Sequence, residues 1–337
     1  MNLIDRIKAF YLLGNKIDHL STEERELLYT KTANLNPWFI PSSIELSLQG
    51  ISSFLKEENL HAWVSSYGPL EEANKKVGIA MAGNIPLVGF HDYLCVLISG
   101  NQAIVKLSAQ DSVLLPALHD WLIEIEPRFS GKLVIEERLK NIDGMIATGS
   151  DNTSRYFEYY FRNIPHIIRK NRSSVAILMG EEETSHLTEL GKDLFSYFGL
   201  GCRNISKLYI PEGYEFKNLF ESWESYKDII NHHKYANNYD YQKSILLVNQ
   251  VSHYDNGFVL LTQNDQLVSP VAVVYLESYS TQSDLKRKMK SHQNKIQCIV
   301  SANGWFEGSV PFGKAQLPEL SDYADGIDTL KFLAEIR

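Results

Sequence analysis

Short apolar runs that alternate with helical stretches are the feature that most constrains the fold of this chain. Such runs occupy residues 77–82, 103–107, 132–135 and 145–148. Stretches with helical periodicity, such as residues 112–126, separate several of them. Short apolar runs are typical of buried strands, and their alternation with helices is the pattern of a parallel sheet with covering helices. We therefore expect an α/β fold.

Composition bounds the class of protein. The chain has 337 residues, enough to bury roughly three-quarters of its unfolded surface in one or two cores. Hydrophobic residues make up 44% and charged residues 22%, as in soluble globular enzymes. The net charge of −8 argues against a broad nucleic-acid-binding surface. Because no apolar run approaches the ~18 residues of a membrane span and residues 1–6 lack a signal-peptide core, we expect a cytoplasmic protein.

The cysteines single out one residue. Cys95, Cys202 and Cys298 are too widely spaced for a disulfide framework or a zinc site, so we expect no bound metal. Cys202 follows two glycines, Gly199 and Gly201, which let backbone or substrate approach closely because they carry no Cβ.

A cysteine in a tight turn between a helix and a strand is close to backbone N–H groups. That surrounding favours the thiolate and stabilises an oxyanion. An apolar run at residues 205–211 and the helical pattern before Gly199 predict such a turn around Cys202. The alternative is a buried structural cysteine, since cysteine is among the most buried residue types.

Four segments resemble motifs of the aldehyde dehydrogenase superfamily, and they occur in the family's order. Residues 199–208 resemble its nucleophile segment, with Leu200 in place of the usual Gln and Lys207 in place of the usual Arg. The other three segments lie upstream. Residues 77–87 are similar to the family's strand that ends in Asn-Phe-Pro-Leu. Residues 97–108 are similar to its cofactor segment Gly-Asn…Lys-Pro-Ser, and residues 142–150 to its Thr-Gly-Ser turn.

The resemblance implies catalytic roles for two residues. Cys202 would be the nucleophile, and the side chain of Asn84 would form the oxyanion hole together with the backbone N–H of the nucleophile. It also implies an aldehyde-dehydrogenase-like fold, in which a Rossmann-type cofactor domain is joined to a second α/β domain that carries the cysteine.

The resemblance also implies a nicotinamide-cofactor site. Lys106 and Ser108 would face the adenosine ribose, and a Lys there can pair with a 2′-phosphate. Gly149 and Ser150 would open a helix whose N-terminus receives the pyrophosphate. We expect NADPH, with NADH as the alternative, although no G-x-G-x-x-G fingerprint follows a strand. Taken singly, a Lys at a strand end is usually a solvated charge, and Thr-Gly-Ser is usually a turn.

The sequence departs from the superfamily at its general base. Aligning the basic residue and Ser of the family's Glu-Leu-Gly-Gly-Lys-Ser-Pro motif with residues 172–173 places Ile168 where the Glu belongs. An aldehyde oxidiser needs that Glu to activate the water that hydrolyses its acyl-enzyme. The alternative is that Glu158 or residues 181–183 supply a base.

Within the superfamily the chain looks most similar to the acyl-CoA reductases related to the fatty-acid reductase of bacterial luminescence (the LuxC family). The resemblance lies in its short length, in the basic segment 169–174 and in the tail 311–328. It implies NADPH-dependent reduction of an acyl-CoA or acyl-carrier thioester to an aldehyde through an S-acyl-cysteine intermediate.

Other functions remain open on the same scaffold. One is an acyl-phosphate reductase or a CoA-acylating aldehyde dehydrogenase. Another is a non-reducing acyl-transfer or docking subunit. The differences from the superfamily's motifs at Leu107, Leu200 and residues 266–268 are compatible with this alternative. A homodimer is also open, although residues 61–76 leave little room for the superfamily's dimerisation hairpin.

We assign residues 1–177 to an N-terminal region with the cofactor domain, and residues 178–337 to the catalytic domain. Residues 180–185 predict either a hinge between the domains or an ordinary loop and helix start. Residues 232–241 predict either the border of an acyl channel or a polar surface with half-buried tyrosines. We expect Asp322, Asp325 and Asp328 to be exposed, because no metal-binding loop surrounds them.

Overall fold

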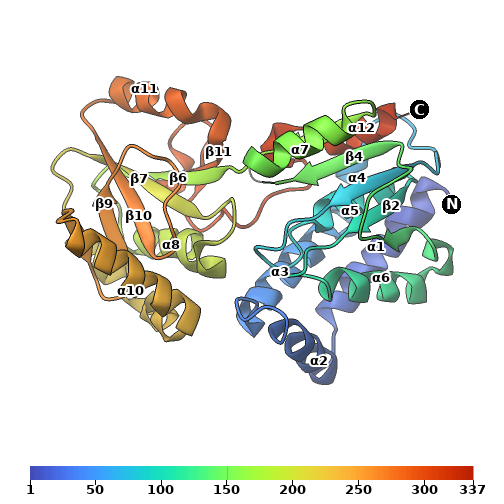
Figure 1. The fold of residues 1–337 in the computed structure, drawn as a ribbon, viewed down its shortest axis with the longest axis horizontal. Coiled ribbons are helices and arrows are strands. Elements are labelled where there is room, and N and C mark those ends of the chain that lie inside the picture. Colours follow the sequence, from blue (N-terminus) through green and yellow to red (C-terminus); the bar gives the residue numbers. More distant parts are fainter. Residues whose placement is uncertain (150, 337) are drawn as a thin grey trace. The chain divides into compact units, whose positions relative to one another are not determined.

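The chain divides into two compact units (Figure 1). The computed structural model describes residues 1–149 and 151–336, with residues 151 and 152 described by their backbone alone. Unit 1 comprises Met1–Asn171 and Glu319–Arg337, and unit 2 comprises Arg172–Pro318. The boundary that we predicted after residue 177 falls at the end of a strand of unit 2, and the final segment returns to unit 1 instead of completing the second domain.

Unit 1 contains a five-stranded parallel sheet with the strand order β3-β2-β1-β4-β5. Its central strands are buried along nearly their whole length, as expected for a parallel sheet with helices on its faces. The apolar runs predicted at residues 77–82, 103–107, 132–135 and 145–148 all correspond to strands of this sheet. The strands are β1 (Lys76–Ala80), β2 (Gln102–Lys106), β3 (Leu133–Ile135), β4 (Gly144–Thr148) and β5 (His166–Arg169).

Most of the helices of unit 1 contribute apolar side chains to one large core, whereas Phe157 and Phe161 of the seventh helix pack in a separate cluster with Ala80, Met145 and Ala147. The ring of Phe10 packs edge-on against Tyr93 and Phe129, with centroids 6.4 and 5.6 Å apart. At the start of the second helix, Ser21 and Glu24 form a reciprocal capping box. The helices are α1 (Leu3–Asp18), α2 (Thr22–Ala33), α3 (Pro41–Phe54), α4 (Glu57–Ser65), α5 (Phe90–Ile98), α6 (Leu114–Ile125), α7 (Asp151–Phe161) and α12 (Thr329–Glu335).

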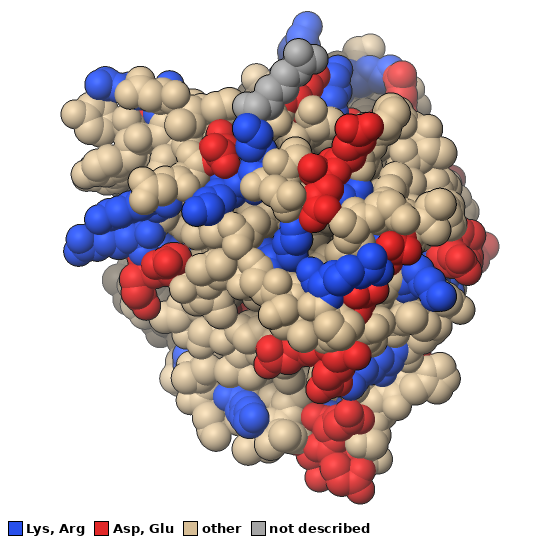
Figure 2. Space-filling model, turned by 90° about the vertical axis from the view of Figure 1, so that its right-hand side faces the viewer, with Lys and Arg blue, Asp and Glu red and all other residues tan. Residues whose placement is uncertain are grey.

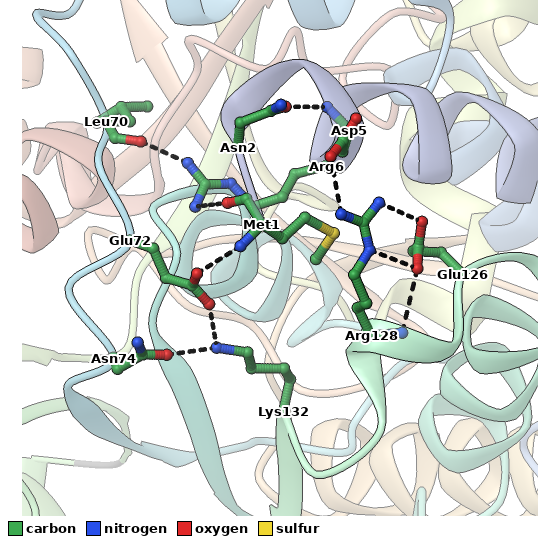
Figure 3. Close-up of polar contacts among 10 residues, drawn as sticks. All are labelled: Met1, Asn2, Asp5, Arg6, Leu70, Glu72, Asn74, Glu126, Arg128 and Lys132. Atoms are coloured by element: carbon green, nitrogen blue, oxygen red, sulfur yellow. Dashed lines mark hydrogen bonds and ion pairs between the residues drawn. The ribbon is translucent and has the colours of Figure 1, made fainter.

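Polar contacts fasten α1 to the segment that leads into β1 (Figure 3). Arg6 is 1% exposed, and its guanidinium donates to the carbonyl of Leu70. Gly100 has φ +81°, and a Cβ there would lie 2.3 Å from the Arg6 guanidinium, so only glycine fits. Glu72 pairs with Lys132 at 2.7 Å, and this hydrogen bond is the main reason that its pKa falls to about 2.

The C-terminal segment is held in unit 1 by buried polar contacts. Arg169, at the end of β5, pairs with Asp92 of α5 at 2.6 Å and donates to the hydroxyl of Thr329 at 2.7 Å. The hydroxyl of Tyr323 accepts from the indole N–H of Trp63 at 2.7 Å. These contacts explain why residues beyond Pro318 belong to unit 1.

The expectation of three exposed acids in this segment is wrong for two of them. Asp322 is exposed, whereas Asp325 and Asp328 are partly buried. Asp328 caps α12 by accepting from the backbone N–H of Lys331 at 2.8 Å, and it also accepts from the hydroxyl of Tyr67 at 2.9 Å. Asp328 is therefore the N-cap of α12 and not part of a solvated face.

Unit 2 is built on a seven-stranded sheet with the order β12-β11-β6-β7-β10-β9-β8. Its neighbouring strands are parallel except for the β8–β9 pair. The strands are β6 (Ser173–Ile177), β7 (Ile205–Pro211), β8 (His253–Asp255), β9 (Leu260–Gln263), β10 (Val273–Tyr279), β11 (Ile296–Ser301) and β12 (Val310–Pro311). Its helices are α8 (Thr184–Phe195), α9 (Lys217–Trp223), α10 (His233–Val248) and α11 (Gln282–His292).

Residues 180–185 lie inside unit 2, where residues 180–183 belong to the loop after β6 and residues 184–185 begin α8, so the alternative of a loop and helix start describes them and the hinge does not. The core beneath α8 includes Trp223, which is fully buried and donates its indole N–H to the carbonyl of Leu187 at 3.0 Å.

Within the described residues, no helix combines the length and apolarity that are needed to cross a bilayer. On the face that Figure 2 shows, acidic and basic side chains are interspersed.

We predict that Asp92→Ala lowers the free energy of unfolding by about 3–5 kcal/mol, because it leaves the Arg169 guanidinium buried without its counterion. Urea unfolding of the full chain measures this loss. Glu124→Gln is the control, since it alters an ion pair in which Glu124 is 63% exposed and should cost less than about 1 kcal/mol. Equal losses in both variants would contradict the prediction.

Candidate active site

Residues from three of the recognised motifs meet at one edge of the unit 1 sheet. Asn84 lies in the loop after β1, Lys106 is the last residue of β2, and Gly149 follows β4. Because β1 pairs in parallel with both β2 and β4, the carboxyl ends of these strands are adjacent. Following the chain, β2 and β3 are added on one side of β1, and β4 and β5 are added on its other side. The strand order therefore reverses at the junction between β1 and β4. Open α/β sheets bind ligands at such a switch point.

The loops after β1 and β2 are packed tightly together. A Cβ on Gly83 would lie 2.5 Å from the hydroxyl oxygen of Ser108, so the two loops meet at a position without a side chain. The backbone N–H of Leu87, which has φ +57°, donates to the carboxylate of Asp111 at 2.7 Å. Asp111 is 8% exposed, and burial raises its pKa to about 6.

Asp111 therefore supports the loop that carries Asn84, a role that the sequence analysis missed. The available signal was the Ser-x-x-Asp spacing from Ser108, which is typical of a turn in which side chains bond nearby backbone groups. The hydroxyl of Ser108 accepts from the backbone N–H of Gln110 at 3.2 Å, a hydrogen bond within its own loop.

The residues at this edge fit a dinucleotide. Lys106 is exposed at the end of β2, as a partner for a ribose or a 2′-phosphate must be. Gly149 lies two residues before the start of α7, and a Cβ on Gly149 would lie 3.0 Å from the Cβ of Thr153, so glycine leaves room for the side chains of this helix. The first N–H groups of a helix bind phosphate well. Ser150, the fourth predicted cofactor residue, lies outside the described residues.

Cys202 lies in unit 2, between the end of α8 and the start of β7. The thiol-bearing residue is exposed, whereas Cys95 and Cys298 are buried; all three are within the described chain and none is disulfide-bonded. The alternative of a buried structural cysteine is thereby excluded for Cys202. Before it, Tyr197, Phe198 and Gly199 have φ values of +53°, +57° and +76°.

Residues 201–204 form a turn with Cys202 and Arg203 at its corner. The backbone N–H of Asn204 donates to the carbonyl of Gly201 at 3.0 Å, which closes the turn. The hydroxyl of Ser174, on β6, donates to the carbonyl of Cys202 at 2.9 Å. The sheet thus fixes the backbone that presents the thiol.

The polar segment 232–241 begins close to this loop. The rings of His232 and Phe198 lie 4.4 Å apart, and the segment continues as the first turns of α10. Tyr235 and Tyr239 are buried rather than half-buried. The segment therefore borders the loop before Cys202 through His232 and through Tyr235, whose ring centroid lies 6.1 Å from that of Phe198, whereas Tyr241 is exposed.

Lys207, which follows Cys202 in the sequence, is a buried residue of β7. Its ammonium group is fully buried, donates to the carbonyl of Asp265 at 2.9 Å and pairs with Glu277. The pair links β7 to β10, its neighbour in the sheet. Where the superfamily has Arg, this chain thus has an internal ion pair just after its cysteine.

No carboxylate stands at the position aligned with the general base. Ile168 is a partly buried residue of β5 and packs with the apolar residues Met145 and Ala147. Glu158 is exposed and pairs with Lys170 at 3.4 Å.

Residues 181–183 cannot replace that base beside Cys202 within unit 2. They follow the carboxyl end of β6, whereas Cys202 precedes the amino end of the parallel strand β7. At a rise of about 3.3 Å per residue, these two edges of the sheet lie roughly 15 Å apart. Glu182 instead accepts from the backbone N–H of Gly180 at 3.0 Å.

No protein-family model matches this sequence, and no curated protein sequence matches it. Solved structures do match. An aldehyde dehydrogenase of Mycobacterium tuberculosis complexed with NAD+ is 15% identical, with a TM-score of 0.64 over 89% of this chain and 73% of that one.

The indole-3-acetaldehyde dehydrogenase AldA of P. syringae, in complex with NAD+, is 10% identical, with a TM-score of 0.68 over 92% and 74% of the two chains. An NADP dependent enzyme of E. coli is 13% identical, with a TM-score of 0.63 over 89% and 73%. The expected fold is thus confirmed: the chain has the aldehyde dehydrogenase fold, with a Rossmann-type domain and a second α/β domain.

We predict that Asp111→Asn becomes more stable relative to the wild type as pH rises from about 4 to about 8. The folded-state pKa of about 6 exceeds the unfolded value of about 3.9, so the native state holds the proton more tightly and loses stability as the carboxyl ionises. Urea unfolding at both pH values should show a relative gain of about 1–3 kcal/mol. If the difference in the free energy of unfolding between the variant and the wild type did not change with pH, the prediction would be contradicted.

Proposed function

We propose that this chain reduces an acyl thioester, acyl-CoA or acyl-carrier, to an aldehyde through an S-acyl intermediate on Cys202. The observation that supports the proposal is an exposed cysteine, Cys202, on an aldehyde dehydrogenase fold, together with an isoleucine, Ile168, at the position to which the motif alignment assigns the general base. Without a general base to activate water, hydrolysis of the acyl-enzyme is slow, so the acyl-enzyme persists long enough to be reduced.

The chain's own groups account for the acylation step. The Cys202 thiolate forms a bond to the acyl carbon, the bond from that carbon to the carrier's sulfur breaks, and the carrier thiol leaves with a proton. We assign to Asn84 and the backbone N–H of Cys202 the oxyanion role that the resemblance implies; losing one such donor costs ~10²–10³ in rate. Lys106 and the N-terminus of α7 would hold a nicotinamide cofactor, which when bound supplies the hydride.

The proposed balance consumes one hydride and one proton for each thioester. After the acyl carbon accepts the hydride, its bond to the Cys202 sulfur breaks, which releases the aldehyde and restores the thiolate. The products are aldehyde, carrier thiol and oxidised cofactor. The exposed Lys106 supports NADPH, with NADH as the alternative.

The experiment is intact mass after mixing the protein with a panel of acyl-CoAs, with and without NADPH. We expect an acyl adduct that NADPH removes with release of aldehyde. The adduct should be absent in Cys202→Ser and present in Cys298→Ser, a buried cysteine of the same unit. An adduct indifferent to either nicotinamide cofactor would favour an acyl-transfer subunit. Absence of any adduct would overturn the proposal.

We further predict that Ile168→Glu accelerates loss of the acyl adduct in the absence of cofactor, because it restores a carboxylate at the position of the family's base. Time-resolved intact mass measures the decay. Ile168→Gln is the matched control, since it has similar size and polarity without a basic group. Equal decay in both variants would show that position 168 does not govern hydrolysis.

A further inference from the structure

The loop that carries Cys202 adopts a conformation that it cannot hold alone. Tyr197 and Phe198 both lie in the left-handed region, with φ values of +53° and +57°. Non-glycine residues in this region cost about 1–3 kcal/mol each and persist only where surrounding contacts hold them. The neighbouring contacts must therefore fix the loop between α8 and β7.

The side chain of Asn204 supplies one set of these contacts. Asn204 is 2% exposed, and its amide oxygen accepts from the backbone N–H of Gly201 at 2.8 Å. Its amide N–H groups donate to the carbonyls of Asp193 at 3.0 Å and Ser196 at 2.8 Å. One side chain thus joins the last carbonyls of α8 to the turn that bears Cys202, across both ends of the strained segment.

The side chain of Asp193 supplies the second set. It is fully buried, and its two carboxylate oxygens accept from the backbone N–H groups of Gly313 at 2.7 Å and Ala315 at 2.9 Å. The carbonyl of Ala315 in turn accepts from the guanidinium of Arg203, the residue next to Cys202.

These contacts close a ring. It runs from the Cys202 turn through Asn204 to the backbone of Asp193, then through the Asp193 carboxylate to residues 313–315, and back through Arg203. A buried network in which every bond depends on its neighbours is rigid while it is intact and loosens as a unit.

We infer that Asn204 and Asp193 are positioning residues, which hold the Cys202 turn through one linked ring of hydrogen bonds. This inference deepens the proposed function by assigning the residues that orient its nucleophile. Displacement of a reacting group by about 1 Å can cost 10²-fold in rate.

The ring contains a group that titrates near neutral pH. Burial raises the pKa of Asp193 to about 7. The backbone N–H groups of Gly313 and Ala315 and the charge of Arg203 lower this pKa, whereas Glu189 on the same helix raises it. Burial raises the pKa of Tyr226, and the negative charges of Glu189 and Asp193 raise it further. Protonation converts one acceptor oxygen to a hydroxyl and weakens the hold on residues 313–315.

The first test is hydrogen exchange of the full chain, read by mass spectrometry over residues 196–204 and 311–318. We expect Asn204→Ala and the near-isosteric Asp193→Asn each to speed exchange in both segments by ~10-fold or more, because opening at one bond frees the ring. Asn218→Ala, an exposed residue of α9, is the control and should change neither segment. The inference would be overturned if either variant sped exchange in only one of the two segments, or if neither variant sped exchange in either segment.

The second test is the pH profile of Cys202 alkylation by iodoacetamide, followed by peptide mass. This readout needs no acyl substrate or cofactor, so its outcome is independent of the proposed function. We expect the wild type to show an inflection near pH 7 besides that of the thiol, and Asp193→Asn to lack it. Identical profiles would show that Asp193 supports the fold without positioning the cysteine.

Discussion

Parallel pairing of strands is the constraint on which both halves of this protein depend. A parallel sheet brings all its strand ends of one kind to a single edge, so segments far apart in sequence become neighbours without any contact between their side chains. In unit 1 this places the loops after β1, β2 and β4 together, with Asn84, Lys106 and Gly149. In unit 2 the same rule places Cys202 at the amino edge and residues 181–183 at the opposite one.

Buried carboxylates stabilise the loops at these edges. Asp111 and Asp193 each accept backbone N–H groups from a loop at a candidate site, and burial raises the pKa of both. Glu72 shows the contrast: it is paired with a lysine near the surface, and its pKa falls to about 2. Desolvation dominates where a carboxylate has only backbone donors, whereas direct pairing with a cation dominates at Glu72.

The sequence predicted the first sheet well because each of its apolar runs is short and is bounded by polar residues. It predicted the turn before Cys202 because glycines and a following apolar run mark it. It missed Asn204, Asp193 and Asp111, because nothing in a residue's type reveals a bond to a partner 120 residues away, as between Asp193 and Gly313. The return of the final segment to unit 1 was missed for the same reason, since Arg169 and Thr329 are 160 residues apart.

The order in which the two units can be completed follows from that return. Unit 2 is one continuous stretch, Arg172–Pro318, inserted between the two parts of unit 1. During synthesis from the N-terminus, unit 2 has its whole sequence available while unit 1 still lacks α12 and the hydroxyl of Thr329 that bonds Arg169. The earlier half of the chain is thus the later to be finished, and until residues 319–336 emerge its buried arginine depends on Asp92 without the hydroxyl of Thr329.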